Sequence, residues 1–145
     1  MFKTIIVALI ILFISQYFLM FVLEPMKELK QTISKIAVSI EYYANILYSI
    51  NVASIEDSVE FKNEFRKLAS LLRPQVDTIP FYDTFRFLFS LPNRSKLLDS
   101  TLDLIGLSNT TTQVPFESIE KRVNRIKQLL NIYMKMLYFF IISKI

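Results

Sequence analysis

The chain opens with an uninterrupted apolar segment. Residues 4–23 read TIIVALIILFISQYFLMFVL and carry no charged side chain. A hydrocarbon core of about 30 Å requires about 20 apolar residues in a helix, so this segment is long enough to span a membrane. A secretory signal peptide has a shorter apolar region of about 7–15 residues and a small-residue cleavage site, and no such site follows residue 23. The pattern predicts a transmembrane anchor over residues 1–23.

Beyond Glu24-Pro25, apolar positions recur at helical spacing. Pro25 lacks a backbone N–H, so the helix is expected to kink or restart there. Apolar residues then alternate at intervals of three and four, which is one face of a helix ending near Asn51. This apolar seam consists of Met26, Leu29, Ile33, Ile36, Ile40, Tyr43, Leu47 and Ile50.

The same alternation marks a last helix, which Pro115 opens. Its apolar positions are Phe116, Ile119, Val123, Ile126, Leu130, Tyr133, Leu137 and Phe140. We expect the two long helices to pack on each other, or each on shorter helices between them. Residues 132–145 form an apolar tail, which is either a buried terminal helix or a segment lying at the membrane.

A third helix is expected over residues 55–72. Ser54 and Asp57 resemble a capping box at its start, and Pro74 is expected to end it. Its buried positions are predicted to be Val59, Phe65, Leu68, Ala69 and Leu72.

Two shorter helices are expected next. In the first, Pro80 occupies the first turn with Thr78 as its cap, and Phe81, Phe85, Leu88 and Phe89 share one side. In the second, Asn93 or Ser95 is the cap, and Gly106 is expected as the left-handed residue after the C-terminus. Its buried face is predicted to be Leu98, Leu102 and Ile105, and residues 107–114 are expected to form a loop.

The predicted fold class is therefore all-α, with an N-terminal transmembrane helix followed by a small antiparallel helical bundle. The expected division is an anchor at 1–23 and a bundle at 24–145, including the apolar tail 132–145.

Composition excludes several chemistries. The 145 residues are 52% hydrophobic and include one Gly, no Cys and no His. Zinc fingers, disulfide frameworks, Cys or His nucleophiles and glycine-rich phosphate loops are therefore excluded. The acid pairs Asp99/Asp103 and Glu60/Glu64 have no histidine companion and are expected to lie at the surface. We expect no enzyme, no catalytic residue, no cofactor and no metal.

The net charge of the chain is +4, and its densest basic cluster consists of Lys121, Arg122, Arg125 and Lys127. This cluster either contacts anionic head groups or forms a solvated helix face that pairs with acids at Glu56, Asp57, Glu60 and Glu64. Nucleic-acid binding is not expected, because the charge is modest and no aromatic residue interleaves the cluster. The positive-inside rule, applied to Lys27, Lys30 and Lys35, places the bundle on the cytoplasmic side.

The aromatic segment from Ile79 to Phe89 is the second candidate site. Its residues Phe81, Phe85 and Phe89 are candidates for a lipid-facing wedge, an apolar ligand pocket or a partner surface, and core packing is the alternative. Arg73 and Arg86 flank this segment and are expected to pair with Asp77 or Asp83.

Several short motifs resemble those of small bacterial membrane proteins with a single N-terminal span. They are Glu24-Pro25, Ile36-Ala37, Tyr43-Ala44-Asn45, Leu72-Arg73, Ile79-Pro80-Phe81-Tyr82 and Leu104-Ile105-Gly106-Leu107-Ser108-Asn109. The resemblance implies no particular activity. It directs attention to Ile-Pro-Phe-Tyr and Gly-Leu-Ser-Asn.

The function predicted from these features is that of a membrane-anchored helical interaction or scaffold protein. Its expected partners are the lipid bilayer and either a second copy or another membrane protein. One alternative is a small membrane-active protein, holin-like or toxin-like, that uses the anchor and the tail together. Another is a helical module that binds lipid or an apolar ligand.

Overall fold

A computed structural model describes residues 2–44, 55–110 and 115–132 of the chain. Every regular element in these ranges is helical, which confirms the all-α class. The elements are α1 (Phe2–Phe18), the π-helical turn η1 (Leu19–Leu23), α2 (Glu24–Tyr42), α4 (Ile55–Thr78), α5 (Tyr82–Phe85), the 3-10 turn η2 (Arg86–Phe89), α6 (Arg94–Ser108) and α7 (Phe116–Leu129).

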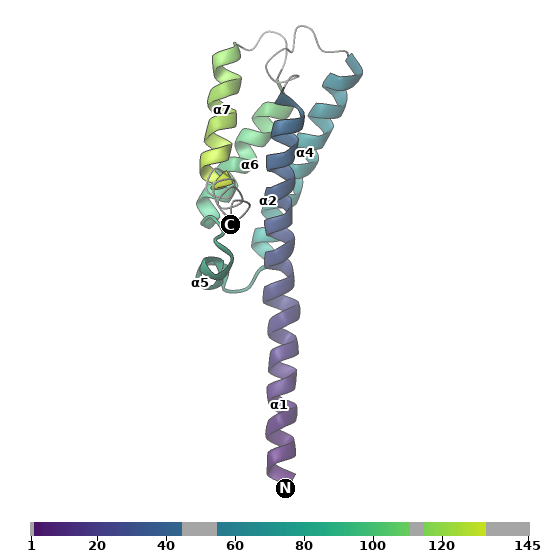
Figure 1. Ribbon diagram of the computed structural model, residues 1–145, viewed down its shortest axis with the longest axis vertical. Coiled ribbons are helices and arrows are strands. Elements are labelled where there is room, and N and C mark those ends of the chain that lie inside the picture. Colours follow the sequence, from purple (N-terminus) through teal and green to yellow (C-terminus); the bar gives the residue numbers. More distant parts are fainter. Residues whose placement is uncertain (1, 45–54, 111–114, 133–145) are drawn as a thin grey trace, which may run out of the picture.

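The first helix extends far beyond the rest of the molecule (Figure 1). The helical path Phe2–Tyr42 covers 41 residues, and in the described part of the chain it alone is long and apolar enough to cross a membrane. None of the residues of α1 is buried. α1 is therefore an exposed arm, whereas Val22 in the turn that follows it is buried by the bundle.

The helix continues through Pro25, with a local widening in place of a break. Pro25 has no N–H to donate to the carbonyl one α-turn earlier. The preceding turn is π-helical, and the Glu24 N–H donates to the Leu19 carbonyl, five residues back. The extra residue in that turn accommodates the proline, because a π-bulge shifts the hydrogen-bond register while the helix axis continues.

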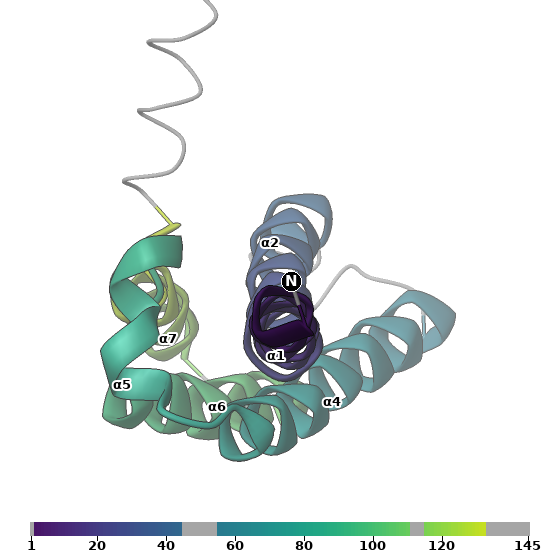
Figure 2. The same cartoon turned by 90° about the horizontal axis from the view of Figure 1, so that it is seen from below.

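In the described part of the chain, α2, α4, α6 and α7 form an antiparallel bundle at the end of this arm (Figure 1). α2 leads away from α1, α4 returns, α6 leads away again, and α7 returns toward the end from which α1 projects. Seen from below, α4, α6 and α7 form an arc around α2 (Figure 2). α4 packs on both α2 and α6, and α6 packs on α7, so each seamed helix packs mainly on a helix that lies between the two in the sequence.

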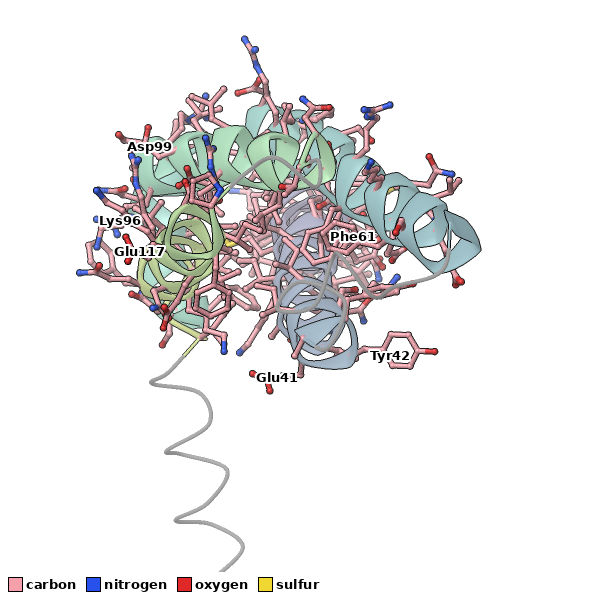
Figure 3. All side chains as sticks on the ribbon, turned by 90° about the horizontal axis from the view of Figure 1, so that it is seen from above. Glu41, Tyr42, Phe61, Lys96, Asp99 and Glu117 are labelled. Carbon is pink, nitrogen blue, oxygen red and sulfur yellow. The ribbon has the colours of Figure 1, made fainter. Side chains whose placement is uncertain are left out.

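The core confirms the predicted seam wherever the seam lies in described residues. Met26, Leu29, Ile33 and Ile36 are fully buried. From α4 the side chain of Phe61 points inward (Figure 3), where it packs on Phe65 and Tyr43. The remaining predicted seam positions of this helix, Leu47 and Ile50, lie outside the described residues.

α4 differs from its prediction in two ways. Phe65, Leu68, Ala69 and Leu72 are buried as expected, but Val59 is exposed, and Phe61 takes its place in the core. The helix also passes through Pro74 and ends at Thr78. Val76 and Ile79 are buried beyond the proline, so core packing offsets the roughly 3 kcal/mol that an internal proline costs. The expected cap at Ser54 lies outside the described residues, as do the side chains of Glu56 and Asp57.

The predicted start of the next helix is wrong. Thr78 does not cap it, because its hydroxyl donates to the Gln75 carbonyl within α4. The residue before α5 is Phe81, which adopts a left-handed backbone.

α6 begins as predicted but buries the opposite face. The Asn93 side chain accepts a hydrogen bond from the Lys96 N–H and caps the helix. The buried positions are Leu97, Ser100, Thr101, Asp103, Leu104, Leu107 and Ser108, whereas Leu102 and Ile105 are exposed. Gly106 lies inside the helix, which continues to Ser108, so its predicted role as a helix stop is wrong, as is a loop beginning at 107.

α7 ends earlier than predicted. Ile119, Val123, Ile126 and Leu130 are buried as predicted, but Phe116, the first position of the predicted apolar face, is exposed. The helix ends at Leu129, and Asn131 adopts a left-handed backbone with φ 55°, a conformation that Asn tolerates better than most residues. The expectations for the rest of the tail concern residues 133–145, which lie outside the described residues.

Candidate functional site

The aromatic segment forms a compact corner between α4 and α6, defined here as residues 79–92. Two left-handed residues other than glycine bracket its helical turns, Phe81 with φ 53° and Ser90 with φ 52°. The Phe81 carbonyl accepts hydrogen bonds from the N–H groups of Thr84 and Phe85 at 3.0 and 3.2 Å. A left-handed backbone costs about 1–2 kcal/mol at a residue with a side chain, so the surrounding contacts must hold this turn in place.

Tyr82 holds the two ends of the aromatic corner together. Its ring is buried, and its hydroxyl donates to the Pro92 carbonyl at 2.6 Å. Burial raises the pKa of Tyr82 well above the ordinary value for tyrosine, so the hydroxyl keeps its proton and remains a donor.

The aromatic corner separates the three phenylalanines that the sequence grouped together. Phe85 is half-buried and packs edge-on against Phe18 of α1, with ring centroids 5.2 Å apart. Phe89 is half-buried against the core, but Phe81 is 77% exposed. Two further side chains join Phe81 at the surface, Phe87 at 70% and Leu88 at 71% exposure.

Charged side chains lie beside these exposed apolar ones. The Arg86 guanidinium lies 4.4 Å from the centroid of the Phe87 ring, a cation–π geometry, and its Nε lies 3.7 Å from an Asp83 carboxylate oxygen. Arg73 lies 3.9 Å from Asp77 in the adjoining turn of α4. The predicted pairing of Arg73 and Arg86 with these two acids is thus confirmed.

The basic cluster on α7 reaches partners different from those predicted. Arg125 Nε and Arg122 Nη1 lie 3.3 and 3.9 Å from the carboxylate of Asp103 on α6. Lys127 Nζ donates to Glu41 on α2 at 2.9 Å. Lys121 is exposed. Three members of the cluster therefore join α7 to its neighbours.

Asp103 is buried, in contrast to the expected surface position. Burial raises the pKa of its carboxyl group, and the neighbouring charges of Arg125 and Arg122 only partly oppose that rise. Gly106 makes room for one of these partners, because a Cβ at this position would overlap the Arg122 guanidinium. The absence of a side chain at this position lets the guanidinium of α7 lie close to the backbone of α6.

The other acid pair, Glu60 and Glu64, lies near the far end of the bundle. Burial of the Tyr43 ring, followed by the nearby charge of Glu60 and a hydrogen bond to it, raises the pKa of the Tyr43 hydroxyl. The described part of the chain contains no group of three or more Asp or Glu residues that could hold a metal ion.

An apolar groove lies on the outer side of α4 and α6. It has a volume of about 530 Å³, with Leu98, Leu102 and Ile105 on one wall and Ala69 and Pro74 on the other. Arg66 and Arg73 lie among its lining residues. The sequence singled out the three α6 residues as apolar neighbours but predicted that they would be buried.

The fold and these surfaces define a helical bundle extended by one long apolar helix, with an outward groove and an exposed aromatic corner. Comparison of the chain with protein-family models, curated proteins and solved structures gives no match.

Proposed function

We propose that this protein is a membrane-anchored helical interaction module. Residues 4–23 form about 30 Å of apolar helix at about 1.5 Å per residue, close to the thickness of a hydrocarbon core. The side chains of this helix are largely exposed, so a bilayer would cover surface that water would otherwise contact. Val22 is buried by the bundle and Phe18 packs on Phe85, which favours retention of the helix over its removal as a signal sequence.

One observation carries the interaction role: α6 is more apolar on its outer face than an ordinary surface helix. It buries Ser100, Thr101 and Asp103 while leaving Leu102 67% and Ile105 40% exposed. Large contiguous apolar patches are uncommon on monomeric proteins and mark contact surfaces. The outer groove therefore fits an apolar helix of a partner protein.

Charge favours a different protein over a second copy as that partner. Arg66 and Arg73 are both exposed beside the groove. Two copies that met groove to groove would bring these like charges together, which opposes association. The proposed partner is a membrane protein whose apolar helix is flanked by acidic residues, on the cytoplasmic side that Lys27, Lys30 and Lys35 indicate.

Membrane anchoring is tested by alkaline carbonate extraction of the full chain, followed by N-terminal sequencing of the membrane fraction. We expect the protein to stay with the membrane and to retain residues 2–23. A mature chain that begins after residue 23, or release of the intact chain by carbonate, would contradict the anchor.

The groove is tested by photo-crosslinking in the full chain. A photoreactive phenylalanine analogue replaces Leu102 in the groove, and a matched control carries it at Tyr42, which is 75% exposed and points away from the bundle (Figure 3). We expect one partner at position 102, absent at position 42, whose crosslinked segment is apolar with flanking acids. Crosslinks from position 102 to a second copy, or equal yields at the two positions, would reject the proposed partner.

Two alternative functions are an apolar-ligand pocket and a membrane-active protein. A pocket lined by Phe81 is disfavoured, because a side chain 77% exposed does not wall an enclosed cavity. The holin-like or toxin-like alternative depends on the apolar tail, most of which lies outside the described residues, and it stays a prediction.

A further inference from the structure

The aromatic corner has three exposed apolar side chains at the end of the bundle from which α1 projects. α5 lies at that end of the bundle in Figure 1, and in Figure 2 it lies on the near side when the molecule is seen from below. Phe81, Phe87 and Leu88 are each at least 70% exposed. The corner is also fixed in shape by Tyr82, whose hydroxyl bonds to the Pro92 carbonyl. A turn held by this bond therefore leaves three large apolar side chains exposed beside α5, which lies at this end of the bundle.

The contact with α1 sets the depth of the corner. Phe85 packs on Phe18, which lies five residues before Leu23, the last residue of the apolar segment. Five residues of helix span about 7.5 Å. If the apolar segment occupies the hydrocarbon core up to Leu23, Phe85 reaches below the outer boundary of that core. Amphipathic elements that lie in the bilayer interface bury their apolar side by about 5–10 Å, so the depths agree.

The charges around the corner fit the same location. Lys27 and Lys30 are exposed on α2 within two turns of Leu23, at the level where head groups would lie. Arg86 covers the Phe87 ring, and its Nε lies 3.7 Å from the carboxylate of Asp83, so a cation and an exposed acid both lie beside the ring. An aromatic ring with a cationic cover is suited to the boundary between acyl chains and phosphates.

We propose that the aromatic corner is a second membrane contact, in which Phe81, Phe87 and Leu88 enter the interfacial layer of the bilayer that holds α1. The proposal rests on the anchoring role of α1 given above. The occupant is the lipid interface, because the corner is continuous with the apolar segment through the Phe18–Phe85 contact. With two attachment points the bundle is held at a fixed tilt, so the α4–α6 groove keeps one orientation relative to the membrane.

Tryptophan fluorescence tests the depth directly, because the chain contains no tryptophan of its own. Three full-length variants each replace one exposed aromatic residue: Phe87→Trp in the corner, Phe13→Trp in the middle of the apolar segment, and Tyr42→Trp at the far end of the bundle. Leu88→Trp repeats the corner measurement at a second position. Each variant is placed as a single copy in a nanodisc of phosphatidylcholine and phosphatidylglycerol, with bromines either near the head-group end of the acyl chains or near their tips.

We expect Phe87→Trp and Leu88→Trp to show blue-shifted emission and greater loss of intensity with the shallow bromines than with the deep ones. Phe13→Trp should lose more intensity with the deep bromines, and Tyr42→Trp should emit as in water and lose none. Corner tryptophans that behave like Tyr42→Trp, while Phe13→Trp is quenched, would overturn the second contact and leave the anchor intact. Absence of quenching at Phe13→Trp would instead overturn the anchor, and the proposal with it.

Discussion

Replacing Asp103 by Asn tests whether the charge of this buried carboxylate stabilises the contact between α6 and α7. Asp103 is 6% exposed, and its nearest cationic atoms are Arg125 Nε at 3.3 Å and Arg122 Nη1 at 3.9 Å. Burial raises its pKa in spite of both arginines, so the folded state disfavours the ionised form relative to the unfolded state. The contribution of Asp103 to stability must therefore fall as pH rises from the ordinary value of 3.8 toward the raised folded value.

The expected magnitude follows from exposure. Both arginine side chains are about half exposed, at 46% and 57%, so each pair contributes only about 0–1 kcal/mol. Asp103→Asn, which keeps the volume and removes the charge, should therefore lie within about 1 kcal/mol of the parent at neutral pH, on the more stable side. At a pH below 3.8 the two proteins should unfold alike.

The assay is thermal unfolding of the full chain in detergent micelles, followed by far-ultraviolet circular dichroism across the acidic to neutral range. A difference of 1 kcal/mol corresponds to a shift of about 4–8 °C in Tm for a domain of 60–100 residues. Asp99→Asn, one turn earlier on α6 and less buried, is the matched control and should leave the pH dependence in place. A loss of more than about 2 kcal/mol for Asp103→Asn at neutral pH, or a difference from the parent that does not vary with pH, would refute this reasoning.

Three further changes probe the packing, each measured as the shift in the denaturation midpoint of the full chain in micelles. Phe65→Ala should destabilise the bundle by about 3–5 kcal/mol because the ring is fully buried, whereas the exposed Val59→Ala on the same helix should change stability by less than about 0.5 kcal/mol. Tyr82→Phe should cost about 1–3 kcal/mol, since it leaves the Pro92 carbonyl without its buried donor; no loss would mean that the aromatic corner does not depend on this bond. Gly106→Ala should stabilise the bundle by up to about 1 kcal/mol, because alanine has the higher helix propensity and the Arg122 end that it displaces is flexible and half exposed. A loss of stability would show that displacing Arg122 costs more than the gain in helix propensity.

The seam of α2 could be predicted from sequence because only one of its faces is apolar. Its apolar residues recur at helical intervals and alternate with charged positions, so only one face of the helix could be buried. That face carries Met26, Leu29, Ile33 and Ile36. α6 offered no such contrast, since leucines lie on both of its sides. The face that the structure buries carries Leu97, Leu104 and Leu107, and it is chosen by contacts with other helices that the sequence of α6 does not show.

The aromatic corner escaped prediction for a local reason. Helical spacing places Phe81, Phe85 and Phe89 on one side only if the backbone stays right-handed. Phe81 and Ser90 are left-handed instead, although neither is a residue type that marks such turns in a sequence. Pro74 is the opposite case. The sequence predicts that this proline ends the helix, but α4 continues through it, because Val76 and Ile79 are buried beyond it.

The helix runs without a break from α1 through the π-helical turn into α2. This continuity fixes the rotation of α1 about its own axis relative to the bundle. Without a flexible joint, α1 cannot rotate about its axis unless α2 and the core around it rotate as well. An α-helix turns about 100° per residue, and the π turn at Leu19–Leu23 shifts the hydrogen-bond register by one residue. Deleting one residue from this turn would therefore rotate the outward sides of α1 relative to the groove by about 100°. The side of α1 that lies on the same face of the molecule as the groove is thus set by this single turn.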